Sequence, residues 1–183
     1  MITVNFPKAN GTIVSYNQAH EYTRRIPTFR SKKQQDRDSK IAAQIARAHD
    51  VENDVEKMLD IFFKKQHLLS DPIYWEVLRT VWIAGGSTRN AGKFRPYFLS
   101  KRQAKSWFMT PEDQEAFDNM KFPVMLYRAY DDDNDHGISW TSDKKWCEAY
   151  AKLRGKRIKS KDFSRDAIFA FISRRGESEF IIL

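Results

Sequence analysis

The N-terminal half of the chain shows a helical pattern of apolar residues. From Asp38 they recur at three- and four-residue steps, the period of an amphipathic helix. Residues 49–51 interrupt the series, which predicts two helices separated by a break. Residues 1–35 have little period, and 28–35 are expected to form a solvated arm. The periodic positions are Ile41, Ile45, Ala48, Val55, Met58, Leu59 and Phe62.

Two further helices are marked by their end signals. Asp71 is expected to cap the first, with Pro72 in its first turn and the glycine pair 85–86 at its end. The second begins at Thr110, which precedes Pro111 and two acidic residues suited to a first turn. The apolar face of the first comprises Tyr74, Val77, Leu78, Val81 and Trp82.

After Met120 the pattern changes to short runs of branched and aromatic residues, which predict strands. A helix capped by Thr141 or Ser142 is expected between the second and third strands, followed by a basic loop over 154–165. The predicted strands are 123–130, 138–141, 167–172 and 178–183, and the helix has its apolar face at Trp146, Ala149, Tyr150 and Leu153.

This order of elements predicts an α+β fold, with a helical N-terminal half followed by a strand-rich C-terminal half. Residues 1–120 form the mainly helical region and residues 121–183 the strand-rich core. At 183 residues the chain has the size of a single domain, so we expect one compact unit.

Composition excludes several classes of protein. Hydrophobic residues make up 41% of the chain and aromatic residues 14%, which excludes full disorder. No run approaches the ~18 apolar residues of a membrane span, and residues 1–10 lack the pattern of a secretory signal. The single Cys147 cannot form an internal disulfide. We therefore expect a cytoplasmic protein without membrane contact.

The charge balance favours anionic partners. There are 32 Lys and Arg against 24 Asp and Glu, a net charge of +8. Basic residues concentrate between Lys152 and Arg165, where Asp162 is the one acid. Such a balance suits polyanions or phosphorylated small molecules.

Sequence signals for phosphate and metal sites fail on inspection. Residues 85–93 resemble a phosphate-binding loop, but Ser87 and Phe94 occupy positions that require Gly and Ser or Thr. The acids at 131–135 have the spacing that begins a calcium loop, but His136 stands at its glycine position. The histidines show no metal-ligand spacing. We therefore expect a solvated acidic turn at 131–135, with a loosely bound cation as the open alternative, and no metal cofactor.

An ordered set of polar residues in the predicted strands is the stronger signal. Arg128 lies in the first strand, and Ser139 and Thr141 lie in the second. Glu177 and Glu179 open the last strand, where residues two apart point to one face. Two carboxylates so close discourage each other's ionisation, which is typical of acid–base catalysts.

This set resembles the mono-ADP-ribosyltransferases of the Arg–Ser–Glu class, which occur among bacterial toxins and small bacteriophage proteins. The resemblance covers residues 123–183. Residues 126–129 resemble the arginine motif, 137–142 the Ser-Thr-Ser motif and 177–182 the Glu-x-Glu motif. The sequence departs from the family at Ala129 and Trp140. The resemblance implies a split β-sheet core and a glycosyltransferase that uses NAD as its substrate, without a metal.

The resemblance also implies roles for the two glutamates and the arginine. Glu179 would hold the ribose 2′-hydroxyl and stabilise the oxocarbenium character of the transition state. Glu177 would orient or deprotonate the acceptor, a pattern that goes with arginine acceptors in this family. Arg128 would grip the pyrophosphate or the adjacent ribose.

Further residues would complete the NAD site. Ser139 and Thr141 would brace it by hydrogen bonds, and Trp140 or Tyr150 would cover the nicotinamide. The acceptor would be a macromolecule, foremost a host protein and alternatively a nucleic acid. For a bacteriophage protein, this activity would serve host takeover or anti-defence in the host-cell cytoplasm.

An alternative interpretation is a non-catalytic basic protein that binds nucleic acid or an acidic host factor. It rests on the net charge of +8, on the basic residues at 152–165, and on Trp107 and Phe108 near Lys101 and Arg102. A transferase-like fold that binds NAD or a protein without turnover is a third interpretation.

Overall fold

The computed structural model describes residues 5–7, 13–15, 31–86, 91–133, 135–174 and 177–183. The chain divides into two compact units. The first comprises residues 1–89 and 101–108, and the second comprises residues 90–100 and 109–183. The second unit thus takes in residues that precede the boundary at 120 drawn from the sequence.

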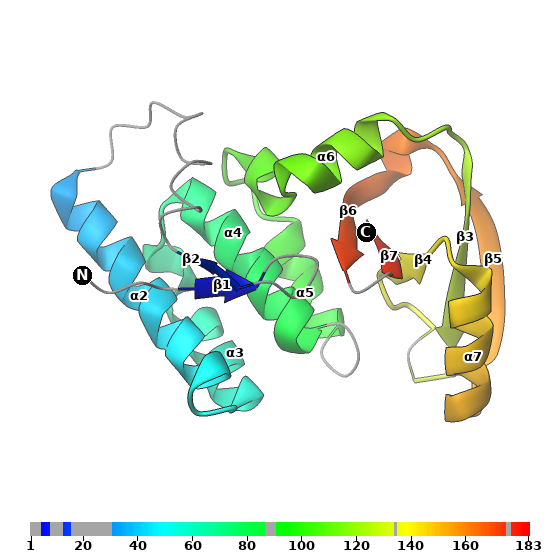
Figure 1. The fold of residues 1–183 in the computed structure, drawn as a ribbon, viewed down its shortest axis with the longest axis horizontal. Coiled ribbons are helices and arrows are strands. Elements are labelled where there is room, and N and C mark those ends of the chain that lie inside the picture. The colour runs from blue at the N-terminus through cyan, green and yellow to red at the C-terminus, as the bar shows by residue number, and fades with distance from the viewer. Residues whose placement is uncertain (1–4, 8–12, 16–30, 87–90, 134, 175–176) are drawn as a thin grey trace. The chain divides into compact units, whose positions relative to one another are not determined.

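The first unit contains most of the predicted helices (Figure 1). The expected break after residue 50 is confirmed, and it separates helix α2 from helix α3. The elements of this unit are β1 (Asn5–Pro7), β2 (Ile13–Ser15), α2 (Lys32–Asp50), α3 (Val55–Lys65), α4 (Asp71–Val81), the π-helical turn Trp82–Gly86 and the 3₁₀ turns Gln66–Leu68 and Lys105–Phe108.

Helix α2 begins earlier than expected. Ser31 is its N-cap and accepts a hydrogen bond from the backbone N–H of Gln34, so residues 32–35 are helical. The solvated arm expected over 28–35 is therefore wrong for these residues, while 28–30 lie outside the described ranges. The cap was missed because exposed polar residues follow it, and no apolar period marks the first turn.

Helix α4 is confirmed, but its expected cap is wrong. Ser70, not Asp71, is the N-cap residue. The Asp71 carboxylate instead accepts hydrogen bonds from the Arg102 guanidinium at 2.8 Å and the Gln103 backbone N–H at 3.0 Å. The buried Asp38 carboxylate accepts from the Ser70 N–H and hydroxyl. Distant segments thus stabilise the start of α4.

The second unit is built on a five-stranded antiparallel sheet with the order β5-β3-β4-β7-β6. The mixed helix and strand content, with the sheet in the C-terminal part, confirms the coarse fold class. The strands are β3 (Val124–Tyr130), β4 (Ser139–Thr141), β5 (Arg157–Phe163), β6 (Ile168–Arg174) and β7 (Glu177–Ile182), and the helices are α5 (Ala91–Phe98), α6 (Pro111–Asp118) and α7 (Lys144–Arg154).

The basic segment expected as a loop over 154–165 is mostly a strand. β5 pairs with the whole length of β3, from Val124 opposite Phe163 to Tyr130 opposite Arg157. Most of its side chains are charged and exposed, as is common in strands at the edge of a sheet. The sequence prediction was wrong because such a strand lacks an alternating apolar face.

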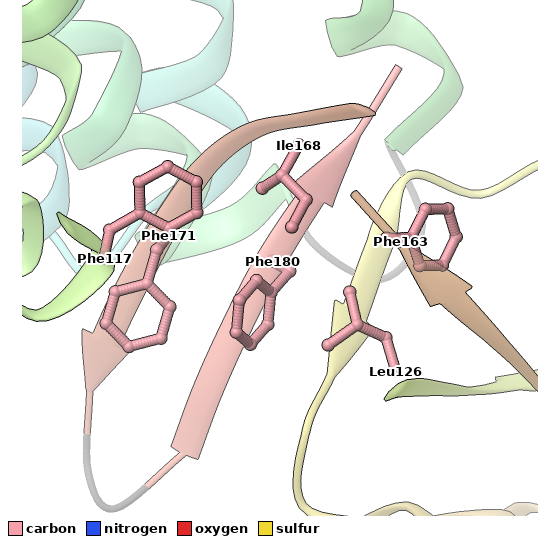
Figure 2. Close-up of a cluster of buried hydrophobic side chains, with 6 residues drawn as sticks. All are labelled: Phe117, Leu126, Phe163, Ile168, Phe171 and Phe180. Carbon is pink, nitrogen blue, oxygen red and sulfur yellow. The ribbon is translucent and has the colours of Figure 1, made fainter. Parts of the chain in front are cut away.

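A hydrophobic cluster holds the sheet to α6, which begins at the predicted cap, Thr110. Figure 2 shows its members, which come from α6 and from four strands. Phe171 and Phe180 are register partners on β6 and β7, and their ring centroids lie 5.1 Å apart. The cluster comprises Phe117, Leu126, Phe163, Ile168, Phe171 and Phe180.

Helix α7 lies alongside β3 and β5 (Figure 1). Its N-cap is Asp143, which accepts from the Trp146 N–H at 2.9 Å, so the cap expected at Thr141 or Ser142 is wrong. Gly155 ends the helix with a φ of 62°, a left-handed conformation that glycine adopts without strain. The helix buries Cys147 and Ala151, not the apolar face expected from the sequence.

No helix in the described ranges combines the length and the apolar character that crossing a membrane requires.

Candidate functional site

The register of β4 and β7 brings four of the predicted polar residues onto one face of the sheet. Thr141 on β4 lies opposite Tyr127 on β3 and opposite Glu179 on β7. Directly paired residues of antiparallel strands point to the same face, and so do residues two apart along a strand. Ser139 and Glu177 therefore share the face of Thr141 and Glu179, whereas Arg128, which follows Tyr127 on β3, starts from the opposite face.

Ser139 joins the arginine strand to the glutamate strand. Its hydroxyl lies 2.6 Å from Oε1 of Glu179, and its backbone carbonyl accepts a hydrogen bond from Nη1 of Arg128 at 2.5 Å. The arginine is 7% exposed and the glutamate 4% exposed. A buried carboxylate next to a hydroxyl donor is held in one orientation, so the position of Glu179 depends on Ser139.

Gly137 provides the space that the Arg128 side chain occupies. A Cβ atom built on Gly137 would lie 1.6 Å from Nη2 and 2.3 Å from Cζ of the guanidinium. No larger residue fits there unless the arginine moves. Glycine is required here by this close approach, and not by a left-handed φ.

Burial sets the electrostatics of the arginine. Desolvation lowers the pKa of Arg128, and the charges of Asp135 and Asp131 act against this shift. An arginine remains protonated at neutral pH even after such a shift. The guanidinium is therefore a fixed positive charge beside Ser139, and it is balanced by the acidic turn that follows β3.

The acids of that turn, Asp131, Asp132 and Asp135, form ion pairs with strand β5 and with the lysine just before it. Nζ of Lys156 lies 2.6 Å from Oδ2 of Asp131, and Nζ of Lys159 lies 2.5 Å from Oδ1 of Asp135. Between them, Arg157 pairs with Asp132. These ion pairs hold the turn against the start of β5. The described residues contain no cluster of three or more acidic, His or Cys side chains that could hold a metal ion.

These ion pairs reduce the positive charge that the basic segment 154–165 offers to a partner. Several of its cations are neutralised within the chain, and Arg165 also pairs, with Asp118 of α6. Strand β5 lies at the edge of the sheet, and β3 separates it from the strands that carry Ser139 and Glu179. The segment is thus less available to an anionic partner than its composition indicates.

Two aromatic residues expected over the nicotinamide lie in different places. The ring of Trp140 packs edge-on against Phe163 at 5.0 Å, on the face of the hydrophobic cluster and away from Ser139. Tyr150 lies on α7, where its ring stacks on Trp146 at 5.3 Å with an interplanar angle of 4°. Tyr150 is among the groups that contribute to the pKa of Arg128, so it lies near this arginine.

Three residues in and around the site have surroundings that the sequence did not indicate. Gly137 follows the acidic turn, and a glycine between a turn and a strand signals a close approach only once its neighbour is known. Asp135 was interpreted as part of a calcium-like pattern, but it pairs with Lys159. Trp146 was assigned to a buried helix face, but it is 39% exposed.

Comparison with protein-family models, with curated proteins and with solved structures finds no match in any of the three. What the site can do must therefore be derived from its own residues.

Proposed function

We propose that this protein is a mono-ADP-ribosyltransferase that cleaves NAD and transfers ADP-ribose to a macromolecular acceptor. The observation that carries the proposal is the connection of Arg128, Ser139 and Glu179 by two hydrogen bonds across three strands. The resemblance of the motifs supplies the order of these residues along the chain. Their convergence in space is an independent observation that supports the same chemistry.

The reaction needs a stabilised positive charge at the ribose. The bond between C1′ and the nicotinamide nitrogen breaks, its electron pair leaves with nicotinamide, and C1′ takes on oxocarbenium character. The Glu179 carboxylate, held by the Ser139 hydroxyl, would stabilise this charge and hold the 2′-hydroxyl. A carboxylate that is already oriented does this without reorganising during the reaction.

The geometry favours a positioning role for Arg128. Its guanidinium is buried against Gly137 and donates to the Ser139 carbonyl, so it fixes the strand segment that orients Glu179. This contact replaces direct binding of the pyrophosphate as its main task. The fixed positive charge would still attract a phosphorylated substrate to this face.

Glu177 would act on the acceptor. It is half-buried and lies two residues before Glu179 on the same face of β7. The acceptor nucleophile attacks C1′, and its proton passes to the Glu177 carboxylate. The acceptor proposed is a host protein, with arginine as the modified residue. In a bacteriophage this reaction would serve host takeover or anti-defence in the host-cell cytoplasm.

Labelled NAD tests the proposal. Wild type, Glu179→Gln and Glu115→Gln are incubated with ³²P-labelled NAD and cell lysate, and the label is followed into protein and RNA. Glu115 is an exposed residue of α6 and serves as the matched control. We expect labelling by wild type and by Glu115→Gln, and none by Glu179→Gln. Absence of label with every variant would contradict the proposal and favour a non-catalytic binding protein.

A further inference from the structure

Helix α7 carries an apolar stripe that the described residues leave partly exposed. Trp146, Tyr150 and Leu153 are spaced four and three residues apart, so they lie on one side of the helix. Trp146 is 39% exposed and Leu153 is 78% exposed. Isolated exposed apolar residues are common on protein surfaces, but a continuous row containing a tryptophan marks an interaction surface.

The two aromatic rings of this stripe are parallel. Their centroids lie 5.3 Å apart and their planes differ by 4°. Stacking fixes both rings in one orientation before any partner arrives, which lowers the entropic cost of binding a flat ligand. Each ring covers one face of the other, so a base can stack only on an outer face, and Trp146 is the more exposed of the two rings. We call this stacked pair, Trp146 and Tyr150, the platform.

Cations flank this platform. Lys145, Lys152 and Arg154 are exposed residues of α7, and the described part of the chain offers them no ion pair. In this they differ from Lys156 and Lys159, which are bound to the acidic turn. Three exposed cations that make no ion pair with the described residues thus lie on the same helix as the two aromatic rings.

We infer that helix α7 binds single-stranded nucleic acid. Bases would stack on the platform, and Lys145, Lys152 and Arg154 would contact the phosphates. Duplex bases already stack on each other and cannot present their faces to the rings, so a single strand is preferred. An acidic peptide would satisfy the cations but leave the flat aromatic surface without a matching partner. This binding goes beyond ADP-ribose transfer and does not depend on it.

The stacking part is tested with fluorescein-labelled 12-nucleotide oligo-dT and oligo-U, by fluorescence anisotropy without NAD. Stacking on one aromatic side chain strengthens the binding of a base about tenfold, so Trp146→Ala is expected to weaken binding by about that factor. Trp146→Phe retains a ring face and should recover part of the loss. Leu99→Ala is the control, because Leu99 is 59% exposed but lies on no aromatic platform.

The electrostatic part is tested with two triple variants of equal charge. One changes Lys145, Lys152 and Arg154 to Gln, and the other changes Lys33, Lys40 and Lys101, which are exposed residues of the first unit. With about 0.7 counterions released per phosphate contact, the first variant should reduce the salt slope by about two, and the second should leave it unchanged. Thermal melting of each variant verifies folding.

Three outcomes would overturn the inference. The first is equal loss of binding in both triple variants, because that reflects net charge alone. The second is unchanged oligonucleotide binding by a folded Trp146→Ala variant. The third is binding of poly-glutamate in preference to both oligonucleotides, because that would identify α7 as a surface for acidic proteins.

Discussion

Ser139 uses both of its polar groups in the site, and Gly137 makes this possible. The Ser139 hydroxyl binds Glu179, and its carbonyl receives the Arg128 guanidinium. The guanidinium reaches the carbonyl only because Gly137 has no side chain. Gly137, which has no side chain, therefore determines how Arg128 and Glu179 are positioned.

We expect Gly137→Ala to displace Arg128 and to impair the site. The added Cβ would lie 1.6 Å from Nη2, so the guanidinium must leave the Ser139 carbonyl or the backbone must shift. Nicotinamide release from NAD should fall at least about tenfold, since displacement of a positioned group by 1 Å can cost about a hundredfold. Gly92→Ala is the control, because a Cβ there meets nothing within 4 Å. Equal activity of the two variants would contradict a positioning role for Arg128.

The positions of the candidate site residues could be predicted from the sequence only in part. The two-residue period of strands placed Glu177 with Glu179 and Ser139 with Thr141. The same period puts Trp140 on the opposite face, so its expected position over the nicotinamide conflicts with the strand pattern itself. The contact of Gly137 with Arg128 joins residues nine positions apart through a side chain, and no local pattern reveals it.

At the level of elements, strand β5 and the acidic turn form a pair. The turn follows β3, and β5 pairs antiparallel with β3 after β4 and α7, so the two charged segments meet at one end of the β3–β5 pair. Their complementary charges were visible in the sequence. Their pairing was not, because the basic segment was predicted as a loop rather than as the partner strand of β3.

The ion pairs of this turn predict acid-dependent stability. The hydrogen bond from Lys159 lowers the pKa of Asp135 below its ordinary value of 3.8. A lowered pKa stabilises the folded state above the ordinary value, and this contribution is lost as the pH falls through the lowered pKa. We expect Asp135→Asn to lower the unfolding free energy near neutral pH and to flatten its decline below about pH 4.

Urea unfolding at a series of pH values measures this effect. Asp166→Asn is the control, since Asp166 is exposed and makes no ion pair with the described residues. A decline for Asp135→Asn as steep as that of wild type would show that the turn contributes nothing to acid stability.

At the level of the whole molecule, the candidate site lies within one unit. Arg128, Ser139 and Glu179 all belong to the second compact unit, whose sheet and hydrophobic cluster position them. The helices of the first unit were predictable from their periodicity and end signals. The function of these helices could not be predicted, because their pattern contains no motif typical of a catalytic or binding site.

We expect the whole chain to bind NAD without a divalent ion. The proposed contact with the ribose comes from Glu179, which Ser139 and Arg128 position, and a carboxylate needs no metal to accept a hydrogen bond from a ribose hydroxyl. Isothermal titration calorimetry with NAD should therefore give the same affinity with excess EDTA and with Mg²⁺. A requirement of NAD binding for the divalent ion would contradict the assignment of the NAD site.

The most direct measurement of the central proposal is nicotinamide release from NAD by purified wild type, Glu179→Gln and Glu177→Gln. Glu179 acts on NAD, so its replacement should lower release about 10²–10³-fold, the effect of removing one electrostatic stabiliser. Glu177 acts on the acceptor, so Glu177→Gln should lose transfer to protein while it retains hydrolysis by water. If nicotinamide release required Glu177 but not Glu179, the assigned roles of the two glutamates would be reversed. If release were unchanged in both variants, the transferase assignment would be contradicted.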